Sequence, residues 1–182
     1  MKLLKRILAG LAVLIVLLLV VALFVKKEYT VQREVTINKP KQEVFSYIKY
    51  LRNQDKFSKW ASMDPAMRKE YRGTDGTVGF VSGWESDKDD VGKGEQTIKR
   101  IEEGNAVDFD LHFIEPFEGR ADARMTTQSL DENQTKVTWS FHSKMPYPMN
   151  VMILFMDMDT MIGEDLQVGL NNLKTRMEKN EL

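Results

Sequence analysis

Residues 28–48 read EYTVQREVTINKPKQEVFSYI, and this stretch decides the fold. Its first ten residues alternate between two faces, which predicts a strand over 28–37. One face holds Val31, Arg33, Val35 and Ile37. Pro40 ends the strand and suits the first turn of a helix, and apolar residues at helical spacing then continue to Leu51. We therefore expect the domain to begin with a strand followed directly by a short helix.

The rest of the chain reads as short strands followed by one long helix. A second short helical piece is expected over Gln54–Trp60. From about 67 to 143, apolar runs alternate with turn-forming residues, which predicts antiparallel hairpins. The expected strands are Arg68–Tyr71, Val78–Ser86, Gly92–Glu102, Ala106–Ile114, Gly119–Ser129 and Thr135–Ser143. After Pro148 the apolar spacing becomes three and four, so a long amphipathic helix is expected from Met149 to about Glu178.

This order of elements predicts an α+β fold. Seven antiparallel strands form a sheet with one apolar face to cover, and only the last helix is long enough to cover it. We expect a curved sheet around that helix, with a space between the two that the short helices close at one end. A parallel α/β sheet is excluded because six consecutive strands lack intervening helices.

A long apolar run precedes the domain. Residues 7–25 read ILAGLAVLIVLLLVVALFV without a charge, and as a helix they cover about 28 Å, close to the hydrocarbon thickness of a bilayer. A cleaved signal peptide is the alternative, but its apolar stretch is normally shorter and ends in a small-x-small site, which residues 22–27 lack. We expect one transmembrane anchor over 1–27 and one domain over 28–182. The larger positive charge before the run predicts the N-terminus inside and the domain in the periplasm or outside the cell.

Charge and composition exclude several classes of function. Residues 28–182 carry 21 basic and 27 acidic groups, a poor match to nucleic acid. The chain has no cysteine, and its two histidines, His112 and His142, are expected on outward faces of strands, so neither a metal site nor a cofactor is predicted. No nucleophile elbow, phosphate-binding loop or dinucleotide fingerprint is present, and the catalytic residues, if any, stay unknown.

Alternating charges occur on one predicted strand. Arg120, Asp122 and Arg124 share one face of the strand over 119–129. A solvated surface ladder explains this pattern most simply, and a buried relay of charges is the alternative.

Three stretches resemble the START-like (SRPBCC) superfamily. Residues 35–48 are similar to its strand-Pro-helix start, Trp60 follows the second short helix as in the family, and residues 164–174 (EDLQVGLNNLK) resemble the Gly-Leu-x-x-Leu-Lys pattern of its last helix. The resemblance covers about residues 30–179 and is closest to polyketide cyclase/dehydrase-like and membrane-anchored members. It implies a helix-grip fold with an internal apolar cavity. The family includes lipid carriers, hormone receptors, cyclases and hydratase-like enzymes, so the fold alone does not decide the function.

Strand alternation indicates which side chains face that cavity. From the strands and short helices the expected lining residues are Trp60, Phe80, Trp84, Phe109, Leu111, Phe113, Trp139 and Phe141, and from the last helix Met152, Phe155, Met156 and Met161. Six of the 11 methionines fall between 145 and 161, and methionine adapts to varied apolar ligands. Ordinary core filling explains the same cluster, as does contact of this stretch with the bilayer.

These patterns favour a membrane-anchored domain that binds a hydrophobic small molecule or lipid. One alternative is a cyclase- or hydratase-type enzyme acting on an apolar carbonyl substrate, and another is a tethered domain that binds a protein partner. An ordered polar pair in the cavity would favour the enzyme, and a wholly apolar cavity the carrier. A filled core with an exposed apolar patch would favour the interaction domain.

Overall fold

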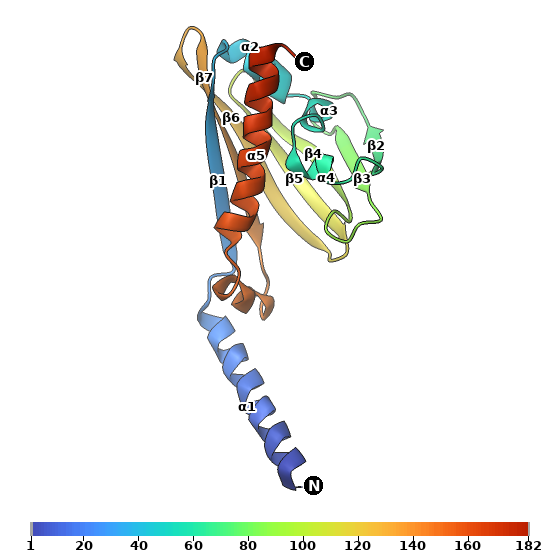
Figure 1. Cartoon of the computed structure of the whole chain (residues 1–182), viewed down its shortest axis with the longest axis vertical. Coiled ribbons are helices and arrows are strands. Elements are labelled where there is room, and N and C mark those ends of the chain that lie inside the picture. The colour runs from blue at the N-terminus through green and yellow to red at the C-terminus, as the bar shows by residue number, and fades with distance from the viewer. Residues whose placement is uncertain (1, 182) are drawn as a thin grey trace.

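A computed structural model describes residues 2–181 and shows a seven-stranded sheet around a C-terminal helix (Figure 1). Helix α1 (Lys2–Phe24) precedes strand β1 (Glu28–Ile37) and three short helices, which are α2 (Lys41–Ile48), α3 (Leu51–Gln54) and α4 (Lys59–Met63). The remaining strands are β2 (Arg68–Arg72), β3 (Val81–Glu85), β4 (Lys93–Glu102), β5 (Ala106–Glu115), β6 (Gly119–Asp131) and β7 (Gln134–Lys144). The 3-10 helix η1 (Met149–Leu154) then leads into α5 (Met158–Lys179). The expected α+β helix-grip fold is confirmed.

The sheet has the order β1-β7-β6-β5-β4-β3-β2, and all neighbouring strands are antiparallel. The register pairs Glu28 with Lys144, Phe113 with Gly119, and Glu85 with Lys93. Because direction alternates from strand to strand, the start of β1, the β5–β6 turn and the β3–β4 loop all lie at one end of the sheet. We call this the anchor end, because α1 connects to β1 there (Figure 1).

The inward face of β1 carries one charge, and α5 neutralises it. Val31 and Ile37 are buried as the alternation predicts. Arg33 on the same face points at the start of α5, where its guanidinium donates to both carboxylate oxygens of Asp159 at 3.0 and 2.9 Å. A Cβ atom added to Gly163 would overlap this guanidinium group. Because Gly163 has no side chain, the side chain of Arg33 can cross the helix at this position.

The core lies between α5 and the concave face of the sheet. Leu166, Leu170 and Leu173 of α5 recur at helical spacing, and each is at most 1 % exposed. The ring of Trp139 lies against Gly169, where an added Cβ would be 2.8 Å from the nearest ring carbon. This close approach explains the glycine in the Gly-Leu-x-x-Leu-Lys pattern of the helix.

The predicted helix from Met149 to Glu178 is wrong in its first third. The chain leaves helical geometry around Asp157, whose carboxylate accepts hydrogen bonds from the backbone N–H of Thr160 at 3.0 Å and from its hydroxyl at 2.6 Å. Asp157 is thus the N-cap of α5. Apolar residues keep their helical spacing across the break, so periodicity alone does not predict where the helix begins.

Two other predicted boundaries are corrected. Instead of one helix over Gln54–Trp60, the chain turns between α3 and α4 so that Phe57 enters the core, edge-on to Trp139 with ring centroids 5.9 Å apart. Strand β3 begins at Val81 rather than at Val78, because Gly79 adopts a φ of +89°, which interrupts the extended backbone. The other predicted strands agree with the structure to within about two residues.

Helix α1 extends away from the sheet as a rod (Figure 1). Among residues 2–181 it is the one helix that is long and apolar enough to cross a membrane, a test that a signal sequence also meets. Only Ala22 of this helix is buried, against η1. The rest of α1 offers its apolar side chains to the surroundings.

Candidate functional site

A cavity of about 360 Å³ lies between the sheet and helices α3, α4 and α5. All three tryptophans of the chain, Trp60, Trp84 and Trp139, line it. Trp60 and Trp139 meet edge-on with centroids 6.2 Å apart, and Trp84 meets Phe113 in the same way at 6.0 Å. The size and the aromatic lining are typical of a site for a single small ligand.

The structure brings half of the predicted lining residues together on this wall. They are Trp60, Trp84, Leu111, Phe113, Trp139 and Phe141. Phe80 and Phe109 also face inward, but they belong to the filled core and do not border the cavity. That the six wall residues contact a ligand stays a prediction.

The four residues predicted from the last helix lie away from the cavity wall. Met152, Phe155, Met156 and Met161 do not border the cavity, and all but Met156 are exposed. For the first three the break at Asp157 is the physical reason, because it turns η1 toward α1 instead of along the sheet, whereas Met161 lies on the exposed side of α5 itself.

Polar side chains form a second part of the wall, and the predicted set of lining residues does not include them. Gln54, Ser58, Ser82 and Gln96 border the cavity, and the first three are less than 9 % exposed. The amides of Gln54 and Gln96 bond each other reciprocally at 3.4 and 3.2 Å, which is long for this type of bond. Both amides therefore keep capacity for a further partner. Period two along β4 places Gln96 on the face of the buried Ile98, and that signal was readable in the sequence.

Asp55, one of five charged residues that border the cavity, is already engaged by the protein. One carboxylate oxygen accepts a hydrogen bond from Lys69 and the other from the hydroxyl of Tyr71, each at 2.7 Å. Burial raises the pKa of Tyr71, and its hydrogen bond to Asp55 raises it further, so the hydroxyl stays protonated. The group forms a neutral, internally bonded corner of the cavity.

The cavity opens at the anchor end. Asp89, Asp90 and Val91 of the β3–β4 loop border it on one side, and Pro116 and Phe117 of the β5–β6 turn on the other. Phe117 is 84 % exposed, which places it at the rim.

Two contacts fix the loop on the β3 side of this opening. Trp84 donates from Nε1 to the carbonyl of Val91 at 3.2 Å. The hydroxyl of Ser86 donates to the buried carboxylate of Asp64 at 2.5 Å. The hydrogen bonds from Ser86 and from the Ala66 N–H lower the pKa of Asp64.

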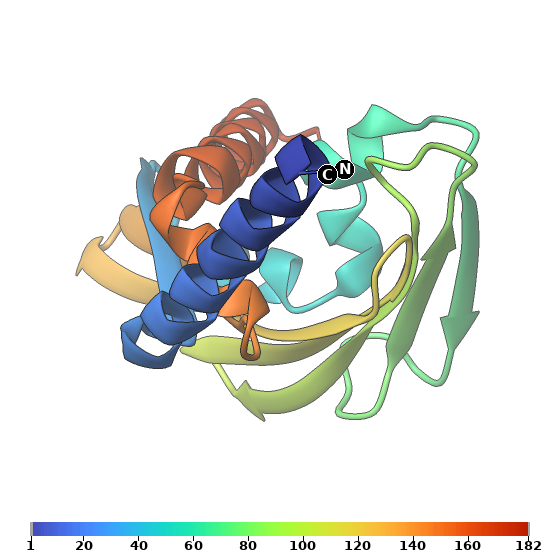
Figure 2. The same cartoon turned by 90° about the horizontal axis from the view of Figure 1, so that it is seen from below.

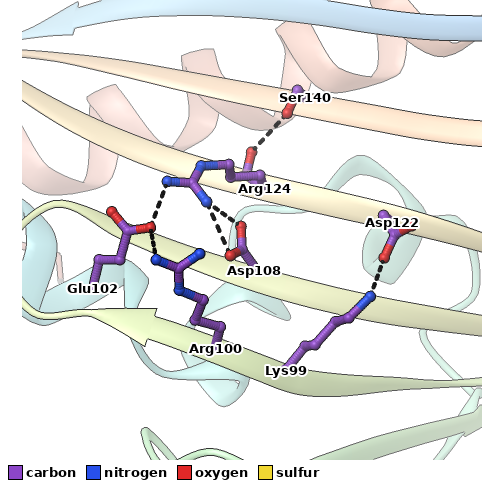
Figure 3. Close-up of polar contacts among 7 residues, drawn as sticks. All are labelled: Lys99, Arg100, Glu102, Asp108, Asp122, Arg124 and Ser140. Atoms are coloured by element: carbon purple, nitrogen blue, oxygen red, sulfur yellow. Dashed lines mark hydrogen bonds and ion pairs between the residues drawn. The ribbon is translucent and has the colours of Figure 1, made fainter.

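The charges predicted on β6 lie on the outer face of the sheet (Figure 3). Arg124 binds Asp108 at 2.7 Å and Glu102 at 3.1 Å, and Lys99 binds Asp122 at 2.8 Å. Each cation is matched by a carboxylate, so the arrangement is a surface ladder and not a buried relay.

Both histidines also lie on this outer face. His142 bonds the hydroxyl of Thr30 at 3.0 Å, and His112 lies 3.5 Å from Glu118. Within residues 2–181, no three His, Asp or Glu side chains gather in a way that could hold a metal ion.

Residues 28–178 match the family model described as polyketide cyclase/dehydrase and lipid transport. The chain belongs to this family. The match covers all seven strands and all of α5 except its last residue. It confirms the START-like (SRPBCC) resemblance of the sequence. No curated protein matches the sequence of this family member.

Solved structures share its fold at low identity. Norcoclaurine synthase from Thalictrum flavum superposes with a TM-score of 0.63 at 10% identity, covering 85% of this chain and 97% of that one. A protein from Thermus thermophilus gives 0.61 at 16%, with 85% and 100% covered. The Zhui aromatase/cyclase from a Streptomyces species gives 0.59 at 13%, with 85% and 96% covered. These similarities show the fold and leave the chemistry to the site.

Proposed function

We propose that this family member is a single-pass membrane protein that binds a hydrophobic small molecule or lipid carrying one uncharged polar group. The cavity between the sheet and α5 supports the proposal, because its walls are aromatic and it contains one pair of amides whose mutual hydrogen bonds are long. Binding buries the apolar part of such a ligand against Trp60, Trp139 and Leu111.

The amide pair sets the character of the polar group. Gln54 and Gln96 together offer N–H donors and carbonyl acceptors, which suits a hydroxyl or carbonyl group. A bare hydrocarbon would leave these buried groups without a better partner, and an anionic group would lose its hydration without meeting a free cation, since Lys69 of the cavity wall already pairs with Asp55.

Binding without catalysis accounts for the site better than the enzyme alternative. A side-chain amide neither gains nor loses a proton near neutral pH, so the polar pair in this cavity does not serve as a general acid or base. Both oxygens of Asp55, the carboxylate next to Gln54, are engaged, and the other carboxylates that border the cavity are exposed; these are Asp89, Asp90 and Glu115. The synthase and the cyclase among the structural neighbours share the fold only.

Contacts between the domain and α1 support an anchor that is retained. The side chain of Asn150 is fully buried and donates to the carbonyls of Ala22 at 2.7 Å and Val25 at 2.9 Å. Cleavage after the apolar run would remove these acceptors and expose the buried amide. The chain would thus consist of an anchor over 1–27 and a binding domain over 28–182. With more positive charge before the run, the N-terminus lies inside and the domain in the periplasm or outside the cell.

Identification of the bound molecule tests the proposal. The full chain is purified in a mild detergent beside Ala61→Phe, which fills the cavity wall at α4, and Ser62→Phe, which adds the same ring at the exposed neighbouring position. Extraction and mass spectrometry should find one class of apolar molecule in the wild type and in Ser62→Phe, and much less of it in Ala61→Phe. Equal amounts in all three proteins would show that the molecule is detergent- or anchor-bound and would refute cavity binding.

A further inference from the structure

One group of exposed apolar side chains surrounds the junction of domain and anchor. We call Met149, Met152, Leu154, Phe155 and Met161 the apolar seat. Phe155 is 76 % exposed and Leu154 is 57 % exposed, although both are large and apolar. Water-facing apolar groups of this kind, gathered at one place, mark an interaction surface. Three of them, Met152, Phe155 and Met161, are residues that the sequence placed in the cavity and that the structure does not.

Hydrogen bonds hold the seat at the level where the apolar helix ends. The last carbonyls of a helix lack partners within the helix, and Asn150 of η1 donates to two carbonyls at this end, those of Ala22 and Val25. The N–H of Met145 also donates to the carbonyl of Lys27 at 2.7 Å. If α1 crosses a bilayer, η1 must lie at the boundary between hydrocarbon and headgroups.

The cavity opening lies at the same end. The strand register brings the β5–β6 turn, with Phe117 at the rim, to the anchor end of the sheet. In Figure 1 α1 leans toward the side of this turn, and the view from below in Figure 2 shows α1 passing beneath the domain. A membrane crossed by α1 therefore faces both the seat and the rim of the cavity.

Charges near the seat identify the bilayer as its occupant. Lys26 and Lys27 follow the apolar run, whereas Lys144 at the end of the neighbouring strand is already paired with Glu28 at 3.3 Å. Cations at this height bind lipid phosphates. On the other side of the opening the β3–β4 loop carries Asp89 and Asp90, which limits the contact to the seat and Phe117. Because η1 contacts the end of α1, a bilayer that surrounds α1 also covers the neighbouring seat without any further partner.

We propose that the apolar seat and Phe117 rest on the bilayer surface and hold the cavity opening against it, so that the ligand passes between membrane and cavity without crossing water. The inference rests on the proposed function in its second half, the passage of ligand. Its first half, contact of the seat with lipid, rests on the proposed membrane span α1 together with the geometry of η1 and the β5–β6 turn, and does not depend on cavity binding.

Single labels test the contact with lipid, and the chain favours this method because it contains no cysteine. The full chain carries one cysteine with an environment-sensitive NBD label as Phe155→Cys, Phe117→Cys or the control Glu132→Cys. Glu132 is exposed in the β6–β7 turn at the opposite end of the sheet. The proteins are reconstituted in phosphatidylcholine–phosphatidylglycerol vesicles with and without doxyl-labelled lipid.

The label at 155 and at 117 should shift its emission to the blue and be quenched by doxyl lipid, and the label at 132 should do neither. Equal, water-like emission at all three positions would overturn the proposal. If 155 responds and 117 does not, the seat touches lipid but the opening does not face it, and the passage of ligand directly from the bilayer is overturned.

A transfer assay separates this inference from the proposed function. A dansylated fatty alcohol is offered to the full chain in vesicles and in detergent, with Leu154→Asp/Phe155→Asp, two exposed positions that do not border the cavity, compared with the wild type and with Leu130→Asp, an exposed leucine on β6 near the far end. The double variant should take up the probe several-fold more slowly from vesicles and bind it equally in detergent. Equal rates from vesicles refute direct passage, whereas absence of binding by the wild type in detergent refutes cavity binding and leaves the labelling result to stand for the seat.

Discussion

The amide pair in the cavity gives the sharpest energetic prediction. Gln54→Leu replaces a side chain that is 8 % exposed with an apolar one of similar size and leaves the amide of Gln96 without its protein partner. A buried polar group left unsatisfied costs about 1–3 kcal/mol, and the long bonds of this pair favour the lower half of that range. Gln96→Leu should cost a similar amount by exposing Gln54 to the same loss.

The double variant Gln54→Leu/Gln96→Leu should be close to the wild type in stability, because replacement of both partners by apolar groups is nearly neutral. The two substitutions would then couple by roughly 2–4 kcal/mol in favour of the double variant, which is the sum of the two single losses. For a domain of this length each kcal/mol corresponds to about 2–4 °C in the midpoint of thermal unfolding. The single variants should therefore melt about 2–8 °C below the wild type, and the double variant should melt within about a degree of it.

Thermal unfolding of the full chain in detergent, followed by tryptophan fluorescence, measures these differences. Gln128→Leu, at an exposed position of β6, is the matched control and should leave the midpoint unchanged. Additive losses in the double variant would show that the amides do not depend on each other and would refute the assignment of a coupled polar pair. The double variant should also lose affinity for a fatty alcohol more than for the corresponding alkane.

Three further predictions concern α5 and the cavity opening. Replacing glycine by alanine inside a helix usually raises stability by about 1 kcal/mol. Gly163→Ala should not show this increase, because its Cβ displaces the guanidinium of Arg33 from Asp159; a raised melting midpoint would contradict this. Gly169→Ala should push the ring of Trp139 into the cavity and lower stability by about 1–3 kcal/mol; an unchanged tryptophan spectrum together with an unchanged midpoint would count against the close packing. Hydrogen bonds lower the pKa of Asp64 in the folded state, so its contribution to stability is complete above about pH 4 and disappears as the pH falls through the lowered folded value. Asp64→Asn should therefore lower stability near neutral pH and flatten the acid limb of a stability–pH profile, and an acid limb as steep as that of the wild type would assign the acid transition to other carboxylates.

Strand and turn patterns predicted the fold well because the sheet is built from local signals. Alternation in 28–37, the glycines and asparagines between later runs, and the apolar spacing of α5 each report a neighbourhood of a few residues. These signals agree with one another, and the structure changes their boundaries only where a single residue intervenes, as at Gly79 and Asp157. Periodicity alone does not register such single positions.

The candidate site was harder to predict, since it depends on which inward residues leave a space between them. Phe80 and Trp84 alternate on one predicted strand face, yet only Trp84 borders the cavity. Alternation along a strand predicts which face a side chain lies on, but it does not predict what packs against that side chain. Arg33 illustrates the same limit, because its place on the apolar face makes sense only with Asp159, 126 positions away in the chain. The methionine cluster shows the converse, since the structure exposes Met149, Met152 and Met161, and contact with the bilayer, one of its open explanations, stays a proposal.

Quenching of the intrinsic fluorescence tests the central claim most directly, because all three tryptophans line the cavity. The full chain in detergent is titrated with a brominated fatty alcohol, beside Ala61→Phe and Ser62→Phe, neither of which adds a tryptophan. Cavity binding predicts saturable quenching in the wild type and in Ser62→Phe, and weak, linear quenching in Ala61→Phe. Weak, linear quenching in all three proteins would mean that the cavity does not take up such a molecule and would contradict the account.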